Sequence, residues 1–326
     1  MVQHDFQAVI DGGRVVAADS AAAMYAAARL YYDEGLTQQE VAKRLNVSRS
    51  TVSRLLQLAR ENDIVRIEVR APSPAAGLSA ELAAELGLRR AVVVPAQGPR
   101  AGVQALVAPA LDELGRAGLG AGDVLAVSWG NTVWEIARAA RFPSLRGALL
   151  VPAVGGLDET DVRFQPNEIA RRMAAASGAE VSFLHAPALP APELRRSLLS
   201  DPQIAGRLAL WDRIHTALVG IGKPPAALGV GPAHVLAARD ALIAAVGDVA
   251  SRHFDLAGRP VELPHEDRLL AVTRDQLRAA GAVIAVAAGA EKAASIVGAA
   301  RAKLVDVLVT DATTASSALE IARSAA

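Results

Sequence analysis

A cluster of hydroxyl and guanidinium side chains near the start of the chain has the chemistry of a DNA contact surface. Arginine forks bind guanine edges or phosphates, and short hydroxyls bind either. The pattern does not decide whether each arginine would read a base or hold a phosphate. The cluster consists of Ser48, Arg49, Ser50, Thr51, Ser53 and Arg54.

Two short helices joined by a tight turn would position this cluster. Thr37 and Glu40 match a capping box, in which each side chain bonds the other residue's backbone N–H, so a helix is predicted over 38–45. Asn46 tolerates a left-handed backbone and supplies the turn. The spacing is that of a helix-turn-helix motif, and Thr37 at its entry is a further candidate DNA contact.

The second helix of the motif is predicted over 49–61 with Ser48 as its cap, and an earlier helix over 20–34. The alternating segment 64–70 is typical of a strand and could form a wing. An ordinary three-helix bundle with solvated charges is the alternative. The small Ala42 would let the two helices approach each other. The shared core would be formed by Val41, Leu45, Val47, Val52 and Leu55.

The composition limits the protein classes to consider. The chain has 326 residues, which suggests about two domains, and 52% are hydrophobic, which excludes a largely disordered protein. The absence of cysteine excludes disulfides, thiolate nucleophiles and Cys-ligated metals. Basic and acidic residues balance at 34 each, but a phosphate backbone responds to local charge. With no signal peptide and no apolar run of membrane-spanning length, we expect a cytoplasmic protein without a membrane partner.

A stretch rich in Pro, Ala and Gly divides the chain. Beyond it, short Val, Ile, Leu and Ala runs alternate with helix-length segments, which predicts a doubly wound, mostly parallel α/β sheet. Strands are expected at 91–95, 124–128, 148–154, 180–185, 216–221, 282–287 and 305–310. The predicted parts are an N-terminal tail over 1–19, a winged helix-turn-helix domain over 20–70, a linker over 71–80, and an effector and oligomerisation domain over 81–326.

A polar turn follows one of these predicted strands. It reads Ser128-Trp129-Gly130-Asn131-Thr132 and would present backbone N–H groups and hydroxyls where a helix begins, which favours an anion. Many α/β turns contain the same residue types for geometry alone, so this signal is weak by itself.

Together these segments resemble the SorC family of sugar-binding transcriptional regulators, which is grouped with DeoR-type regulators. The resemblance covers about residues 20–326 and rests on the order and spacing of its motifs. It implies an effector domain with the fold of sugar-phosphate isomerases, a phosphorylated sugar as the typical ligand, and a homo-oligomer, typically a tetramer. The motifs are 37–42, 48–56, 128–132, 151–156, 185–187, 217–222, 247–249, 254–258, 289–292 and 310–315.

The resemblance also implies an effector site with several kinds of group. The polar turn, with Gly130, Asn131 and Thr132, would hold a phosphate or a terminal hydroxyl, and the paired glycines Gly155 and Gly156 would allow close backbone approach. The amide of Asn167 and the carboxylate of Asp248 would bond sugar hydroxyls. Two lysines, Lys223 and Lys292, would pair with an anion.

One position departs from the family pattern. Val154 stands where several relatives carry a basic residue, so a neutral sugar or polyol stays open beside a sugar phosphate. Structural roles stay open too: Lys292 as a solvated helix lysine and Asp248 as a helix cap. The segment 224–233 is rich in Pro and Gly and looks like an insertion, which leaves the placement of Lys223 open.

The sequence therefore predicts a DNA-binding transcriptional regulator of carbohydrate metabolism. Its partners would be operator DNA and a sugar, polyol or sugar-phosphate effector, and whether the effector releases or recruits DNA binding is left open. No catalytic motif, metal-ligand spacing or cofactor is expected, so we expect no enzyme. The alternatives are a sugar-phosphate-processing enzyme fused to a DNA-binding module, and a recombinase or transposase.

Overall fold

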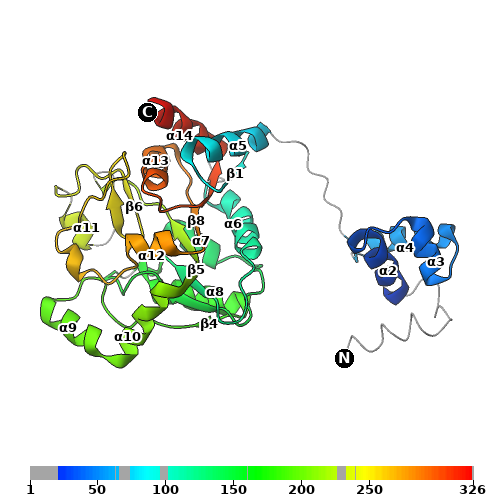
Figure 1. Ribbon diagram of the computed structural model, residues 1–326, viewed down its shortest axis with the longest axis horizontal. Coiled ribbons are helices and arrows are strands. Elements are labelled where there is room, and N and C mark those ends of the chain that lie inside the picture. Colours follow the sequence, from blue (N-terminus) through cyan, green and yellow to red (C-terminus); the bar gives the residue numbers. More distant parts are fainter. Residues whose placement is uncertain are drawn as a thin grey trace. The chain divides into compact units, whose positions relative to one another are not determined.

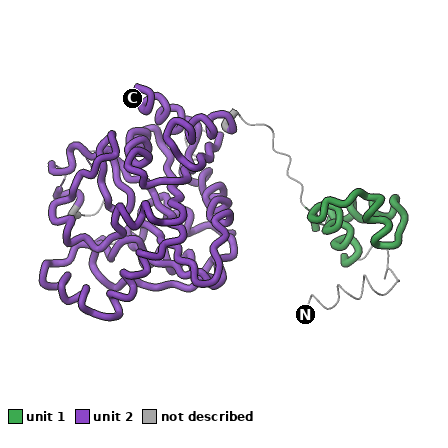
Figure 2. Tube along the Cα trace, viewed as in Figure 1, with its two compact units in different colours: residues 1–71 green, residues 72–326 purple. Residues whose placement is uncertain are grey.

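The computed structural model (Figure 1) describes residues 21–62, 64–65, 74–95, 102–159, 161–225, 233–238 and 240–324. The chain divides into two compact units, residues 1–71 and 72–326 (Figure 2). The predicted tail lies outside the described residues, as does the predicted wing beyond Val65. The predicted linker over 71–80 reaches too far, because helix α5 (Pro74–Leu86) begins at Pro74. Proline is well suited to a first helical turn, where its missing N–H has no intrahelical partner.

The first unit is a helical bundle around one aliphatic cluster. Helix α2 (Ala21–Ala28) continues into a π-helical turn, η1 (Arg29–Asp33), and is followed by α3 (Gln38–Leu45) and α4 (Arg49–Glu61). The predicted core of the motif is confirmed: Val41, Val52 and Leu55 are buried, and Leu45 and Val47 pack against them partly buried. Ala42 is buried in the same cluster.

Local hydrogen bonds fix both ends of α3 and the start of α4. The capping box is formed, since Glu40 N–H donates to Thr37 Oγ1 at 3.3 Å and Thr37 N–H donates to Glu40 Oε2 at 2.8 Å. Asn46 takes the left-handed turn with φ 53° and ψ 47°. Thr51 N–H donates to Ser48 Oγ at 3.1 Å, so Ser48 caps α4 as predicted.

The second unit is built on a seven-stranded parallel sheet with the order β1-β9-β8-β5-β2-β3-β4. Each strand falls on one of the predicted apolar runs, because continuous Val, Ile, Leu and Ala suits a strand covered on both faces. The strands are β1 (Arg90–Val94), β2 (Val124–Val127), β3 (Leu149–Pro152), β4 (Glu180–Val181), β5 (Ile214–Gly220), β8 (Ala282–Val286) and β9 (Val307–Asp311).

Helices cover both faces of this sheet, as the predicted doubly wound fold requires (Figure 1). Side chains alternate between two buried clusters: Leu125 of β2 points into one, and its neighbour Ala126 into the other. The Leu125 side is covered by α6 (Gln104–Arg116), α7 (Asn131–Ala137) and α8 (Pro166–Ser177). The Ala126 side is covered by α5, α12 (Arg274–Ala279), α13 (Ala293–Arg301) and α14 (Ala312–Ser324).

Three features of the connections between strands were not individually predicted. A small antiparallel hairpin, β6 (Gly247–Val249) and β7 (Arg252–Phe254), lies in the connection from β5 to β8. The connection from β4 to β5 carries a helical pair that packs together, α9 (Pro192–Ser200) and α10 (Pro202–Leu208). A short helix, α11 (Ala233–Ala237), precedes the hairpin.

The close packing of Gly258 against the end of α13 generates a stability prediction. Gly258 has φ +79°, and a Cβ there would lie 2.3 Å from the backbone nitrogen of Ala302 and 2.5 Å from the carbonyl carbon of Arg301. Backbone atoms cannot rotate aside, so Gly258→Ala should lower the free energy of unfolding by about 3 kcal/mol. Urea unfolding followed by circular dichroism measures this.

Gly206→Ala is the matched control for that change. Gly206 lies inside α10, and a Cβ added there meets nothing within 4 Å. This variant should be neutral or more stable by up to about 1 kcal/mol, because alanine is the better helix former. Equal destabilisation by the two variants would contradict the packing argument.

Candidate functional site

The exposed face of α4 carries the predicted DNA contacts. Ser48 Oγ lies 2.7 Å from Ser50 Oγ and 2.8 Å from Thr51 Oγ1, so the hydroxyls form one network at the helix start. Thr51 is half-buried, and the other five residues of the cluster are exposed: Ser48, Arg49, Ser50, Ser53 and Arg54. The structure therefore brings the predicted hydroxyl and guanidinium groups to one solvent-facing surface.

The entry to α3 adds to this surface. Thr37 and Arg49 line the same hollow of about 720 Å³ together with Gln38 and Gln39. The Thr37 hydroxyl is already engaged, since it donates to Glu40 Oε2 at 2.7 Å. Thr37 thus orders the helix start, and its direct contact with DNA stays a prediction.

The effector site is expected between β2 and β5, the two neighbouring strands from which the chain continues toward opposite edges of the sheet. From β2 the chain crosses by α7 to β3 on one side, whereas from β5 it crosses to β8 on the other side. Ligands of open parallel sheets bind at the carboxyl ends of two such strands. The residues that follow β2 and β5 are the predicted polar turn and the segment Ile221–Lys223.

Hydrogen bonds hold these two segments together. Gly220 N–H donates to Ser128 Oγ at 3.2 Å, and Ser128 N–H donates to Leu218 O at 3.1 Å. A Cβ on Gly220 would touch the Thr132 side chain at 4.0 Å, so the start of α7 lies against the end of β5. Thr132 is 5% exposed, whereas Asn131 faces solvent.

Arg163 encloses the other side of the polar turn. Gly130, with φ +108°, donates its N–H to Arg163 O at 2.8 Å. The Arg163 guanidinium donates to Asn131 Oδ1 at 3.5 Å and to Asp161 Oδ2 at 2.8 Å. The pKa of the Asp161 carboxyl is lowered by these hydrogen bonds from Arg163. The sequence alone gave no signal for Arg163.

The end of β5 gathers the predicted charged residues. Lys292 Nζ donates to Ile221 O at 2.7 Å, and Gly222 N–H donates to Asp248 O at 2.9 Å. A Cβ on Gly222 would lie 1.8 Å from Asp248 Oδ1, so the carboxylate fits here only because residue 222 has no side chain. Lys223 Nζ lies 2.8 Å from Glu291 Oε1. The predicted trio Lys223, Asp248 and Lys292 is therefore assembled from two connections, since Lys223 and Asp248 lie between β5 and β8 and Lys292 lies between β8 and β9.

A buried ion cluster fixes the hairpin that carries Asp248. Arg252 is 6% exposed and donates to Val272 O, Ala271 O and Glu266 Oε1, each at 2.8 Å. Arg274 donates to the same Glu266 oxygen at 2.7 Å. Burial raises the pKa of Glu266, but the hydrogen bonds from the two arginines and from a backbone N–H outweigh it, and the net pKa is lowered. Arg252 is thus a positioning residue that sequence reasoning missed.

The paired glycines have a role inside the fold. Gly155 N–H donates to Leu270 O at 2.8 Å, and Gly156 N–H donates to Ala186 O at 2.7 Å. A Cβ on Gly155 would lie 2.7 Å from Ala186 O and 2.9 Å from the Pro187 backbone. Close backbone approach at Gly155 is therefore made by the chain itself, and contact of the pair with an effector stays a prediction.

Asn167 also bonds the chain. Its Nδ2 donates to Leu184 O and its Oδ1 accepts from Leu184 N–H, both at 3.0 Å. These bonds fasten the start of α8 to the segment after β4. An effector would have to use the second N–H or lone pair of this amide, so the sugar-binding role of Asn167 stays a prediction.

The surroundings of Val154 account for an apolar residue at this position. It is fully buried, pairs with Ala271 across an isolated bridge and belongs to an apolar cluster with Leu157 and Leu269. Trp129 packs against this cluster. A basic side chain would lie among apolar residues there, and Lys223 and Lys292 stay the predicted cations of the site.

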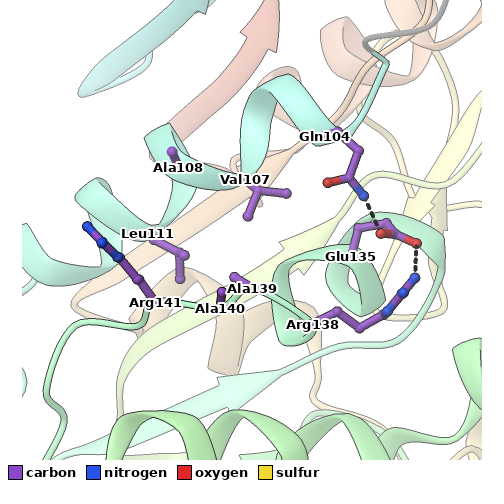
Figure 3. Close-up of a pocket in the computed structure, with 9 residues that line it drawn as sticks. All are labelled: Gln104, Val107, Ala108, Leu111, Glu135, Arg138, Ala139, Ala140 and Arg141. Carbon is purple, nitrogen blue, oxygen red and sulfur yellow. Dashed lines mark hydrogen bonds and ion pairs between the residues drawn. The ribbon is translucent and has the colours of Figure 1, made fainter.

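A separate hollow of about 500 Å³ lies between α6 and the end of α7 (Figure 3). Glu135 joins its two sides, accepting from Gln104 and lying 3.4 Å from Arg138 Nη1. None of the predicted effector residues lines it. Within the described ranges, no group of three or more His, Asp or Glu residues could hold a metal ion, and none of the helices found there is long and apolar enough to cross a membrane.

Comparisons with known proteins agree with both units. Residues 72–320 match the family model described as "Putative sugar-binding domain", and residues 29–62 match "Sigma-70, region 4". The chain is 30% identical over 307 residues to the sorbitol operon regulator of Klebsiella pneumoniae, covering 88% of this chain and 94% of that protein. It is 32% identical over 295 residues to the deoxyribonucleoside regulator of Bacillus subtilis (strain 168), covering 89% and 94%.

The solved structures give the same result. The full-length sorbitol operon regulator SorC of Klebsiella pneumoniae superposes with a TM-score of 0.69 at 30% identity, covering 91% of this chain and 98% of that one. A helix-turn-helix unit joined to a doubly wound α/β domain defines an effector-controlled, DNA-binding transcriptional regulator. The chain belongs to the SorC family of sugar-binding transcriptional regulators.

The burial of Lys292 generates a pH prediction. Burial lowers the pKa of its ammonium group and Lys223 lowers it further, while Asp248 and Glu291 act in the opposite direction. The unfolded chain, with an ordinary lysine pKa of about 10.4, therefore binds this proton more tightly than the folded protein. The stability of the wild type relative to Lys292→Met should rise as pH increases from neutrality toward that value.

Urea unfolding of both proteins across this pH range measures the difference. Lys303→Met, which removes the same charge from an exposed position, controls for net charge. A difference between wild type and Lys292→Met that stays constant with pH would contradict the burial argument.

Proposed function

We propose that the protein regulates carbohydrate genes by binding operator DNA through α4 and an effector at the carboxyl ends of β2 and β5. The observation that supports the effector site is the assembly of Lys223, Asp248 and Lys292 beside the polar turn. A carboxylate suits sugar hydroxyls, and lysines suit an anionic group. The ligand class is therefore a sugar, polyol or sugar phosphate.

The names of the relatives support a hydroxylated ligand. One is a sorbitol operon regulator and the other a deoxyribonucleoside regulator, so both names contain a polyol or a sugar-containing compound. We propose binding without turnover, because these relatives are regulators and Lys292 is bonded to a backbone carbonyl at 2.7 Å. As a regulator of bacterial type it would act in the cytoplasm.

We also propose that several copies act together, as a dimer or tetramer. Helix-turn-helix proteins pair their recognition helices on half-sites about 34 Å apart or at multiples of that distance. Each copy carries only a slight excess of basic residues over 20–70, so useful affinity for DNA would come from more than one copy.

The exposed guanidinium of Arg54 tests the DNA surface. Arg54→Ala should weaken binding at least about tenfold to a duplex that the wild type selects from a random library, as measured by fluorescence anisotropy. A base contact would relax specificity at one position, whereas a phosphate contact would lower the salt dependence. Thermal stabilisation by the effector should stay intact.

Arg60→Ala is the matched control, since Arg60 is exposed on α4 six residues away and so faces a different direction. It should bind DNA within about twofold of wild type. If Arg54→Ala also abolishes effector stabilisation, the division into two functional units is wrong.

Thr132 tests the effector site. A thermal-shift screen of sugars, polyols and their phosphates first identifies a stabilising compound. Thr132→Val keeps the buried shape but removes the hydroxyl, so the midpoint for that compound should rise about tenfold while affinity for DNA without it is unchanged. An unaltered midpoint would remove the polar turn from the site.

Thr216→Val controls for the loss of a buried hydroxyl. Thr216 is 2% exposed and lies nearer the amino end of β5, away from the polar turn. Its variant should keep the wild-type midpoint. An equal rise in both variants would indicate general loosening of the domain rather than a contact with the effector.

A further inference from the structure

Glu291 stands next to the two lysines of the effector site and has no role in the proposed function so far. It lies in η6 (Ala290–Lys292), directly before α13, and its Oε1 is 2.8 Å from Lys223 Nζ. Hydrogen bonding from Lys223 and from the residue's own backbone N–H lowers the pKa of Glu291, so the carboxylate is ionised at neutral pH. A negative group of the protein itself thus holds one of the site's cations.

The loop is shaped to let this carboxylate fold back. Gly289 has φ +108°, and a Cβ there would lie 2.5 Å from Glu291 Oε2 and 2.7 Å from Oε1. Gly289 N–H donates to Thr314 Oγ1 at 2.8 Å, which fixes the backbone beneath it. A side chain at position 289 would exclude the carboxylate from its place, so glycine is required for this arrangement.

The two lysines differ in how firmly they are held. Lys292 is half-buried and its Nζ donates to the carbonyl of Ile221, so its ammonium group is held in one place. The Lys223–Glu291 pair is open to water, with side chains 41% and 52% exposed. Exposed ion pairs are individually weak, so this pair can exchange partners.

We propose that Glu291 occupies the position of an anionic effector group and that such a group displaces it from Lys223. With Glu291 in place, Lys223, Lys292, Asp248 and Glu291 sum to zero charge, and a phosphate would meet two carboxylates. Once Glu291 turns away, two lysines face the phosphate and Asp248 remains for hydroxyls. Glu291 therefore sets the affinity for anionic effectors relative to neutral ones; this rests on the proposed effector site.

The test compares Glu291→Gln with wild type by isothermal titration at constant low ionic strength. The anionic probe is inorganic phosphate and the neutral probe is sorbitol. The variant should bind phosphate about fivefold more tightly. This factor corresponds to the upper end of the free-energy contribution that exposed ion pairs make. Sorbitol affinity should change less than twofold, because no charge is displaced.

Two further variants make the result specific. Glu193→Gln makes the same change in another exposed ion pair, with Arg196 at 3.6 Å on α9, and should leave phosphate binding as in wild type. Lys223→Met removes the cation that both carboxylate and phosphate would use. It should weaken phosphate binding and cancel the gain of Glu291→Gln when the two are combined.

Failure of this inference can be told apart from failure of the effector site. If Lys223→Met weakens phosphate binding but Glu291→Gln leaves it within twofold of wild type, displacement is overturned and the site stands. If phosphate does not bind but sorbitol does, and Asp248→Asn weakens sorbitol, displacement is again overturned and the site stands. If neither probe responds to any of these variants, both proposals are overturned.

Discussion

The parallel sheet constrains where this protein can bind a small molecule. Because parallel strands require crossovers, every connection leaves from a carboxyl end, and the two crossovers that start at β2 and β5 diverge. The polar turn and the segment Ile221–Lys223 are thereby forced side by side, and Gly220 N–H and Ser128 Oγ join them. The rest of the site is added to this edge by segments that the sheet itself does not dictate.

The hairpin β6–β7 is the clearest such addition, and its position depends on a buried ion cluster. Glu266 accepts from both Arg252 and Arg274. Arg252 also donates to the backbone at 271–272, which in turn pairs with residues 153–154 just after β3. Losing Glu266 would leave the buried guanidinium of Arg252 without its counter-ion, and breaking a buried ion pair in this way is strongly destabilising. This cluster therefore gives specificity of placement to Asp248 rather than bulk stability.

Sequence reasoning succeeded where the determining interactions are local. Caps at Thr37 and Ser48 fix the helix-turn-helix, and short runs that are mostly apolar mark the seven strands of the parallel sheet. It failed where interacting residues are distant along the chain. The strands that contain Asp248 and Arg252 have three residues each, too few to show the alternation of polar and apolar residues that predicts a strand. Likewise the family resemblance implied a close backbone approach at Gly155 and Gly156, but only the fold shows that residue 186 makes it at Gly155.

The charges of the site bear on how a regulator of this type can be tuned. An effector controls DNA binding only through its difference in affinity for two states, typically about 1–3 kcal/mol, and the coupling is reciprocal. In the proposed site, where the protein's own charges already cancel, a neutral ligand would gain little from electrostatics. We therefore expect hydroxyl contacts, such as those proposed at Asp248, to decide which neutral ligand binds. An anionic ligand instead competes with an exposed internal ion pair, a contribution of about 1 kcal/mol. One carboxylate can therefore shift effector preference on the same energy scale as the regulation itself.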